Sequence, residues 1–403
     1  KDELITKILS TKLFVGIGLI SYSLYLWHYL IFAFYRIIEF NQESLFYKLL
    51  LVIIILALSI FSYYFIERPA RNKKNKFKFI ISIILILISV LVILNINIVQ
   101  KDGYKNRLPE IFQKNLSDAP WGFLKNSDGN QCYNNIEGCK FNTSSNKKIY
   151  IIGDSHMASL MFNLKDRVVK SNYQFITSTI SWCLFYPSFN LVVVKTNKVY
   201  ENCSDNYFQK LKEILSKDKN SIIIFGGRLP EHLSNYFFDN QEGGIEGNDS
   251  SNKYIPVDRY DNIETSFQNE ISELSKNHKI ILVYPIPEVG WHVPNKLNNI
   301  YLKKIKNVNK KKININEYIT TSYQVYKNRT KSSFELLDSI QGENIYRVYP
   351  HTLFCSTAIK DRCITHNDKN IFYSDDDHPS LKGAETINNL IMKEIEKIEL
   401  KSN

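Results

Sequence analysis

The chain has 403 residues, 44% of them hydrophobic and 23% charged, which is the composition of a globular rather than a disordered protein. Three long apolar runs lie in the first hundred residues, whereas the remaining three hundred are polar and rich in asparagine and lysine, so a simple cytoplasmic enzyme is a poor interpretation. Part of the net charge of +11 lies in a lysine-rich run, residues 303–312. No zinc-finger spacing or RNA-binding aromatic pattern accompanies this run, and we therefore expect no nucleic-acid partner.

The three apolar runs, residues 13–35, 49–66 and 79–99, each supply close to the ~20 residues that a membrane-spanning helix needs. Burial of the first two runs inside a soluble domain is the alternative interpretation. The connection 67–78 is strongly basic, whereas the connection 36–48 is balanced in charge. By the positive-inside rule the basic connection is cytoplasmic, so everything after the third helix is extracytoplasmic. We therefore expect a transmembrane region over residues 1–100.

Six cysteines all lie after residue 130, in the part of the chain predicted to be extracytoplasmic. An even number in such a compartment favours disulfides over a metal site, and the absence of a CxxC pair argues against zinc ribbons and redox motifs. We expect no resident metal. The chain begins at Lys1 without a methionine or a signal peptide, so we expect it to be a fragment or a processed piece of a longer protein.

Two motifs lie in the apolar region: GLISYSLYLWHYL, residues 18–30, and FIERPARN, residues 65–72. A histidine at membrane depth usually faces protein or a cavity, although His28 is equally compatible with an interfacial residue that has no chemical role. Together the two motifs resemble the last two helices of the acyltransferase family three membrane proteins. That family carries its essential histidine and arginine in earlier helices, which nothing in this chain matches, so the resemblance gives His28 no catalytic role.

A candidate nucleophile and its base lie far apart in the sequence. The segment KKIYIIGDS, residues 147–155, predicts a strand that ends in Gly-Asp-Ser, and residues 156–170 have the apolar spacing of a helix. A serine at such a turn lies where backbone N–H groups and the helix dipole stabilise an oxyanion, although Ser155 could instead cap the helix. Near the C-terminus, Asp375 precedes His378 by three residues, a spacing that allows a carboxylate to orient the imidazole.

The pair GDSH and DxxH resembles the SGNH, or GDSL-like, hydrolases, and more narrowly the SGNH domains fused behind acyltransferase family three membrane domains. Those domains end in D-x-x-H-x-S-x-x-G-A, which SDDDHPSLKGAE, residues 374–385, matches. The resemblance implies that Ser155 is the nucleophile, His378 the base and Asp375 its acid; Asp376 and Asp377 lack the three-residue spacing. It also implies an α/β three-layer sandwich with a parallel sheet over residues 147–403, preceded by three transmembrane helices and a linker, residues 101–146.

The expected oxyanion donors are incomplete. Ordinary SGNH hydrolases carry a glycine after the second strand and Gly-x-Asn after the third, whereas this chain has Ser-Trp-Cys at residues 181–183 and Gly-Gly-Arg at residues 226–228. The backbone N–H of Ser155 is therefore the one donor with good support. Gly226, Arg228 and His156 are further candidates for oxyanion or substrate contact, while Arg228 could also be a surface residue and His156 could cap the helix.

The remaining pattern alternates strands with helices, as expected of a parallel sheet. We predict strands at residues 174–180, 221–225, 279–287 and 346–349, and helices at residues 205–215, 262–275, 316–337 and 381–398. Residues 239–253, rich in glycine, asparagine and serine, predict an exposed loop. Sequential pairing of the six cysteines is the simplest of the fifteen possible connectivities and resembles the frame of the fused domains.

These features predict an O-acyltransferase, most simply an O-acetyltransferase, that modifies an envelope polysaccharide such as lipopolysaccharide O-antigen. The fusion resemblance supplies the substrate class and implies a multi-pass protein of the bacterial inner membrane with an extracytoplasmic C-terminal domain. We expect no bound cofactor; the acyl donor would be acetyl-CoA or an acetyl group relayed through a membrane domain outside this chain. The alternatives are a membrane-tethered carbohydrate esterase, with water as acceptor, and a glycan-binding module with a disabled site.

Overall fold

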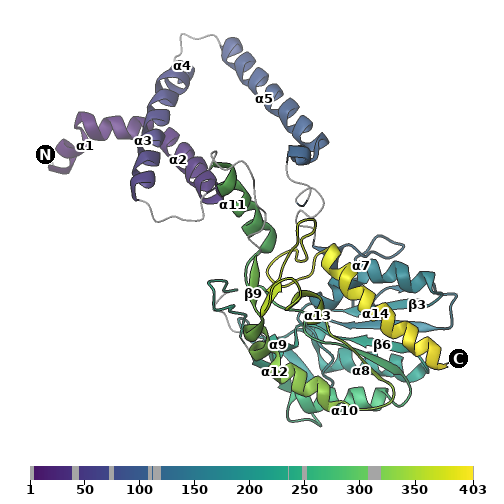
Figure 1. Cartoon of the computed structure of the whole chain (residues 1–403). Helices are drawn as coiled ribbons and strands as arrows, with labels where there is room; N and C mark the ends of the chain where they lie inside the picture. Colours follow the sequence, from purple (N-terminus) through teal and green to yellow (C-terminus); the bar gives the residue numbers. More distant parts are fainter. Residues whose placement is uncertain are drawn as a thin grey trace. The chain divides into compact units, whose positions relative to one another are not determined.

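The computed structural model describes residues 4–38, 45–71, 77–107, 111, 119–234, 236–246, 252–306 and 319–402. The chain divides into two compact units, residues 1–107 with 299–311 and residues 108–298 with 312–403. Figure 1 shows the helical first unit in purple and blue and the α/β second unit in teal to yellow.

The first unit consists of helices. Its long helices are α2 (Lys12–Ile38), α3 (Leu45–Ser62) and α5 (Phe77–Gln100). Among the residues that the structure describes, three segments of this unit are long and apolar enough to cross a membrane, namely Lys12–Tyr35, Lys48–Arg71 and Ile81–Gln100. The prediction of three such helices is therefore confirmed. The shorter elements are α1 (Leu4–Leu9), η1 (Tyr63–Glu67), α4 (Arg68–Arg71) and η2 (Asp102–Arg107).

The two motifs of the apolar region contact each other. Trp27 Nε1 of α2 donates a hydrogen bond to Ser62 Oγ of α3 over 2.8 Å. One turn earlier in α2, the Ser23 hydroxyl donates to the carboxylate of Glu67. Apolar helices pack closely in a membrane when polar side chains hydrogen-bond between them, so the Ser23–Glu67 contact gives a physical reason for pairing SYSLYLWH with IERP. His28 is exposed in this unit, with Nδ1 3.2 Å from the carbonyl oxygen of Tyr25.

The second unit is built on a six-stranded sheet in the order β1-β3-β2-β6-β8-β10. The five strands after the first are parallel, and only β1 (Lys140–Phe141) pairs antiparallel, against β3. The parallel strands are short and rich in buried isoleucine, as expected for a sheet covered on both faces. They are β2 (Lys148–Gly153), β3 (Gln174–Thr179), β6 (Ile222–Phe225), β8 (Lys279–Val283) and β10 (Ile345–Val348).

Helices cover both faces of this sheet, which gives the α/β three-layer sandwich that the sequence predicts. In Figure 1, α7 (Ser155–Lys170) and α14 (Leu381–Ser402) lie together on one side, and the two helices contact each other. The opposite layer contains α8 (Asp205–Lys217), α10 (Ile263–Leu274) and α12 (Tyr323–Ser339). Apolar side chains of these three helices share one core with alternate residues of the strands, among them Tyr150, Ile152, Ile223, Phe225, Phe208, Leu211, Phe267, Ile271 and Leu337.

Smaller elements complete the unit. β4 (Phe189–Val193), β5 (Lys198–Val199) and β7 (Lys253–Pro256) form an antiparallel sheet, and β9 (Thr320–Ser322) pairs with β11 (Arg362–Ile364). The short helices are η3 (Pro120–Gly122), η4 (Glu201–Cys203), α9 (Leu229–Ser234) and α13 (His351–Phe354). The longer α11 (Val293–Lys306) begins in this unit, and its residues from 299 onward belong to the first unit.

Three segments differ from what the sequence predicts. The helix predicted over residues 316–337 begins only at Tyr323, because Thr320–Ser322 form β9 and Ser322 Oγ then caps the helix; residues 316–318 lie outside the described residues. Residues 239–253 are not simply an exposed loop, since Asn240 is fully buried and Glu246 reaches the site described below; residues 247–251 are not among those described. The predicted linker, residues 101–146, contributes β1 to the sheet.

All six cysteines form disulfides, in the sequential pairing that the sequence suggests. The bonds are Cys132–Cys139, Cys183–Cys203 and Cys355–Cys363. The first closes a loop beside the edge of the main sheet, where Cys139 and Thr177 of β3 exchange hydrogen bonds. The second joins the segment after β3 to η4, which directly precedes α8, so two of the three disulfides brace the surroundings of β3.

Candidate active site

The turn between β2 and α7 presents Ser155. Gly153 has a φ of +152°, and a Cβ there would lie 2.2 Å from the carbonyl oxygen of Gly226, so the turn requires glycine. Asp154 caps the helix: one carboxylate oxygen accepts the backbone N–H of His156 over 2.9 Å, and the other accepts the N–H of Arg228 over 2.7 Å. Ser155 is thus the first helical residue and not the cap, so the interpretations of Ser155 or His156 as the cap are wrong.

The structure brings together the three residues predicted to form a triad. His378 Nε2 lies 2.8 Å from Ser155 Oγ, and His378 Nδ1 lies 2.8 Å from Asp375 Oδ2. The other oxygen of Asp375 accepts the backbone N–H groups of Asp377 and His378 over 3.1 and 2.8 Å. The three-residue spacing therefore has a physical basis, because one carboxylate both holds its own turn and orients the imidazole.

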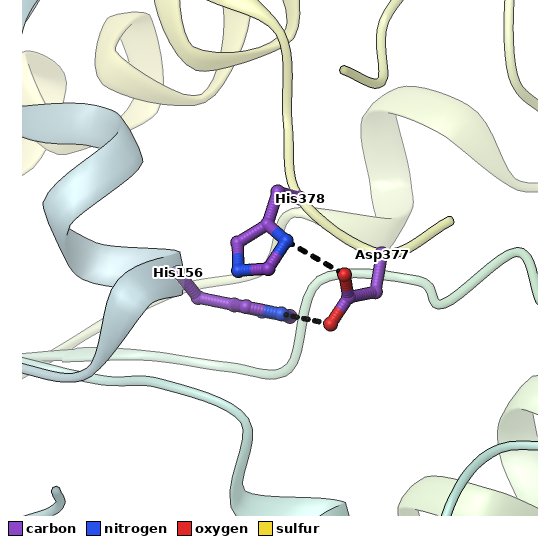
Figure 2. Close-up of side chains that lie close together, drawn as sticks. All are labelled: His156, Asp377 and His378. Atoms are coloured by element: carbon purple, nitrogen blue, oxygen red, sulfur yellow. Dashed lines mark hydrogen bonds and ion pairs between the residues drawn. The ribbon is translucent and has the colours of Figure 1, made fainter. Parts of the chain in front are cut away.

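A second carboxylate, which lacks the three-residue spacing, also faces the histidine. Asp377 Oδ1 lies 2.7 Å from His378 Nδ1, and Oδ2 lies 3.0 Å from His156 Nε2 (Figure 2). Asp377 is only 3% exposed, and Arg228 Nη1 lies 3.1 Å from Oδ2. Spacing alone did not reveal this residue; a run of three aspartates before the histidine was the one signal available. Asp376 has a different task, since its carbonyl oxygen accepts N–H groups of Val289 and Gly290.

These charges perturb the titration of the site. Burial acts to lower the pKa of His378, but the charge of Asp377 and the hydrogen bonds to both aspartates outweigh it and raise that pKa to about 10. Burial raises the pKa of Asp377, whereas Arg228 and His378 hold it well below its usual range. Burial and the neighbouring carboxylates raise the pKa of Asp376 to about 6. The resting site therefore favours an imidazolium paired with carboxylates.

Arg228 occupies the centre of a buried ion network. It is 8% exposed, so the interpretation as a surface arginine is wrong. Its Nε donates to Glu288 over 2.7 Å and its Nη1 to Glu246 over 2.7 Å, besides the contact with Asp377. With these partners, the guanidinium holds the Asp377 carboxylate in place by an ion pair. A role of Arg228 as an oxyanion or substrate contact stays a prediction. Burial and the nearby acids raise the pKa of Glu231, a further neighbour, to about 7.

The other two candidates have identifiable surroundings. His156 is 1% exposed, and its Nε2 contacts Asp377, while its Nδ1 has no hydrogen-bond partner among the described residues. Gly226 lies where β6 approaches α7, and a Cβ there would be 2.7 Å from Met157 Sδ, which makes close packing a sufficient reason for this glycine. His156, Asp377 and His378 bring three potential metal-ligand atoms within 4.8 Å, but hydrogen bonds and ion pairs already join these atoms to one another.

The rest of the C-terminal motif has a structural purpose. Ser380 Oγ donates to the carbonyl oxygen of Ile371 over 2.6 Å and accepts the N–H of Gly383 over 3.1 Å, which holds the start of α14 beneath the histidine turn. A Cβ at Gly383 would lie 2.1 Å from the carbonyl oxygen of Phe372, and Ala384 is fully buried. Serine, glycine and alanine at these positions therefore fix where His378 stands.

One tryptophan flanks the triad, and another is exposed in the segment after β3. The ring of Trp121, from η3, lies 4.3 Å from the ring of His378. Trp182, in the segment after β3, is 37% exposed and packs edge-on against Phe237. Flat apolar rings beside a polar catalytic group are suited to contact the apolar faces of sugar rings.

Comparison with known proteins identifies a family whose model matches most of the chain. Residues 124–393 match the model of the "SGNH domain (fused to AT3 domains)", which is more than half of the chain. No curated protein matches the chain in sequence. Among solved structures, the periplasmic domain of a lipopolysaccharide acetyltransferase of Salmonella ser. Paratyphi A is 17% identical, with a TM-score of 0.39 over 62% of this chain and 83% of that one. A family two carbohydrate esterase of Clostridium thermocellum, in complex with cellohexaose, is 14% identical, with a TM-score of 0.28 over 62% of this chain and 64% of that one.

Proposed function

The chain belongs to the family of SGNH domains fused to AT3 domains, and on this basis we propose that it is a membrane-bound O-acyltransferase that modifies a cell-envelope polysaccharide. The observation that carries the proposal is the hydrogen-bonded chain from Ser155 through His378 to Asp375. Acyl transfer needs a nucleophile, a base that takes its proton and a group that orients the base, and these residues fill the three roles.

In the proposed reaction His378 Nε2 takes the proton of Ser155 as its Oγ attacks the carbonyl carbon of an acyl ester. The bond to the donor's alcohol breaks, and His378 returns the proton to that leaving group. An acyl-Ser155 remains. A sugar hydroxyl then attacks it, gives its proton to His378, and leaves as the acylated sugar while Ser155 Oγ recovers the proton.

The first unit supports the proposed membrane location. Three helices able to span a bilayer and the strongly basic segment 67–78 support a multi-pass protein of the bacterial inner membrane, with the SGNH domain outside the cytoplasm. Three disulfides suit that compartment. The acyl group would come from acetyl-CoA or by relay through a membrane domain outside this chain.

A glycan acceptor is supported by Trp121, whose ring lies beside that of His378. The same triad with water as acceptor would make the chain a carbohydrate esterase, and a site without turnover would make it a glycan-binding module. These three functions differ in what becomes of the acyl group.

The test incubates the 403-residue chain, in detergent, with an acetyl ester donor and an oligosaccharide acceptor. We expect acetylated sugar, detected by mass spectrometry, and its loss in a folded Ser155→Ala variant, because that change removes the atom that carries the acyl group. Acetate release without acetylated sugar would identify an esterase. Sugar binding without turnover would identify a binding module, and unchanged turnover in Ser155→Ala would remove Ser155 from the mechanism.

A further inference from the structure

Two backbone N–H groups that follow the strands beside Ser155 already donate hydrogen bonds within the protein. The backbone N–H of Ser181, after β3, donates to Asn134 Oδ1 over 2.6 Å. The backbone N–H of Arg228, after β6, donates to Asp154 Oδ2 over 2.7 Å. An ester carbonyl under attack needs donors aimed at its developing negative charge, and loss of one such donor typically costs about 10²–10³ in kcat. A donor from elsewhere in the fold would therefore matter.

The loop closed by Cys132–Cys139 brings a hydroxyl to this place. Tyr133 bridges Thr179, the last residue of β3, and the N–H of its neighbour Asn134 donates to the Thr179 carbonyl oxygen over 3.0 Å. Thr179 pairs in turn with Gly153, two residues before Ser155. Tyr133 is thereby fixed one strand away from the nucleophile, at the carboxyl edge of the sheet. Its hydroxyl interacts with those of Ser155 and Ser181.

The loop is held closely enough to define the position of this side chain. Besides the disulfide, Cys139 N–H donates to Thr177 Oγ1 over 3.0 Å, and Gly138, with a φ of +65°, lies so near β3 that a Cβ would be 1.8 Å from the Thr177 carbonyl oxygen. Burial raises the pKa of the Tyr133 phenol above its ordinary value, against the effect of the hydrogen bonds to Ser181 and Ser155. The phenol consequently keeps its proton at neutral pH and can donate it in a hydrogen bond.

We propose that the Tyr133 hydroxyl is an oxyanion donor that acts together with the backbone N–H of Ser155. As Ser155 Oγ bonds to the carbonyl carbon and its proton passes to His378, the carbonyl π electrons move onto oxygen, and Tyr133 donates a hydrogen bond to that oxygen without losing its proton. The electrons return when the bond to the leaving alcohol breaks. This inference rests on the proposed function, and it assigns a chemical task to the disulfide loop.

The test compares Tyr133→Phe with wild type in the full chain, using an aryl acetate. We expect kcat to fall about 10²-fold with KM changed little, because the donor acts only on the developing oxyanion. Tyr207→Phe is the matched control: its hydroxyl hydrogen-bonds Ser178 on β3, and we expect near-normal kcat. A sharper readout is the rate ratio of the oxo ester to its thiono analogue, since sulfur is the weaker hydrogen-bond acceptor. Loss of an oxyanion donor shrinks this ratio, whereas a merely structural defect lowers both rates alike.

An unchanged kcat in Tyr133→Phe, or a fall in kcat with an unchanged oxo-to-thiono ratio, would overturn the assignment of Tyr133. Ser155→Ala separates this failure from failure of the proposed function. If Ser155→Ala is inactive while Tyr133→Phe is fully active, only the Tyr133 inference fails. If the wild-type chain neither turns over the ester nor reacts at Ser155 with a fluorophosphonate, the proposed function fails and the inference falls with it.

Discussion

Replacement of Asp377 by asparagine should move the acid limb of the pH–rate profile to lower pH. Only unprotonated His378 can accept the Ser155 proton, so a pKa raised to about 10 leaves only a small fraction of the molecules competent at pH 7. The 2.7 Å contact between Asp377 Oδ1 and His378 Nδ1 is a major source of that pKa. Two unit charges at this distance attract by about 6 kcal/mol at an effective dielectric constant of 20, and an opposite charge this close typically shifts a pKa by about 1–3 units.

The substitution also removes the negative charge that lies 3.1 Å from Arg228 Nη1. The positive charge of Arg228 is then less balanced, which disfavours the imidazolium and lowers the pKa of His378 further. The assay is the pH dependence of kcat/KM for an aryl acetate, corrected for spontaneous hydrolysis. Wild-type activity should rise up to pH about 10, and the variant should reach its plateau about 1–3 units earlier. Asp376→Asn is the matched control, because Asp376 is the adjacent aspartate and it contacts the neighbouring loop through its backbone carbonyl and not through its side chain. Overlapping profiles for wild type and Asp377→Asn would refute this reasoning.

The same shift links pH to folding. Because the pKa of His378 is raised, its protonated form stabilises the fold fully below its unfolded pKa of about 6.5, and this contribution is lost as the pH rises toward about 10. The thermal midpoint of the wild-type chain should therefore fall across that window more steeply than that of Asp377→Asn. By contrast, Asp375→Asn should mainly lower the plateau rate, since Asp375 holds the histidine turn and accepts from Nδ1. A larger loss of plateau rate in Asp377→Asn would exchange the roles of the two aspartates.

Two further predictions concern the frame of the site. Gly383→Ala should destabilise the chain by about 1–3 kcal/mol, seen as a lower thermal midpoint, because its Cβ would lie 2.1 Å from a backbone oxygen. Gly122→Ala is the control, and its effect should be mild because the new Cβ would meet only the Gln131 side chain. Equal effects of the two substitutions would contradict the packing argument. Reduction of Cys183–Cys203, which spans 20 residues, should cost about 3 kcal/mol of folding free energy, and intact-mass alkylation without reductant should label no cysteine. Labelled cysteines in the unreduced chain would argue against the disulfides.

The sequence was sufficient for the parts of the site that depend on local pattern. Ser155 follows directly from a buried strand and an amphipathic helix, because the turn between such elements has few conformations. Asp375 and His378 lie within one turn, so their spacing already fixes which atoms can meet. The pairing of the SYSLYLWH and IERP motifs was likewise visible, although the atoms joining them, Ser23 Oγ and the carboxylate of Glu67, were not.

What escaped prediction depends on packing between distant segments. Asp377 has the wrong spacing for a local contact with His378, yet Arg228, reached through the next strand of the sheet, and His156, reached through α7, hold its carboxylate beside Nδ1. Arg228 was open to interpretation as a surface residue because its partners Glu246 and Glu288 lie 18 and 60 positions further along the chain. An ion network of this kind is stable only when every charge is matched, since an isolated buried charge would cost several kcal/mol. The role of each residue in the network can therefore be identified only from the folded structure, where its partners are in place. The same is true of Tyr133, because its position depends on a disulfide and a β-bridge and not on its neighbours in the sequence.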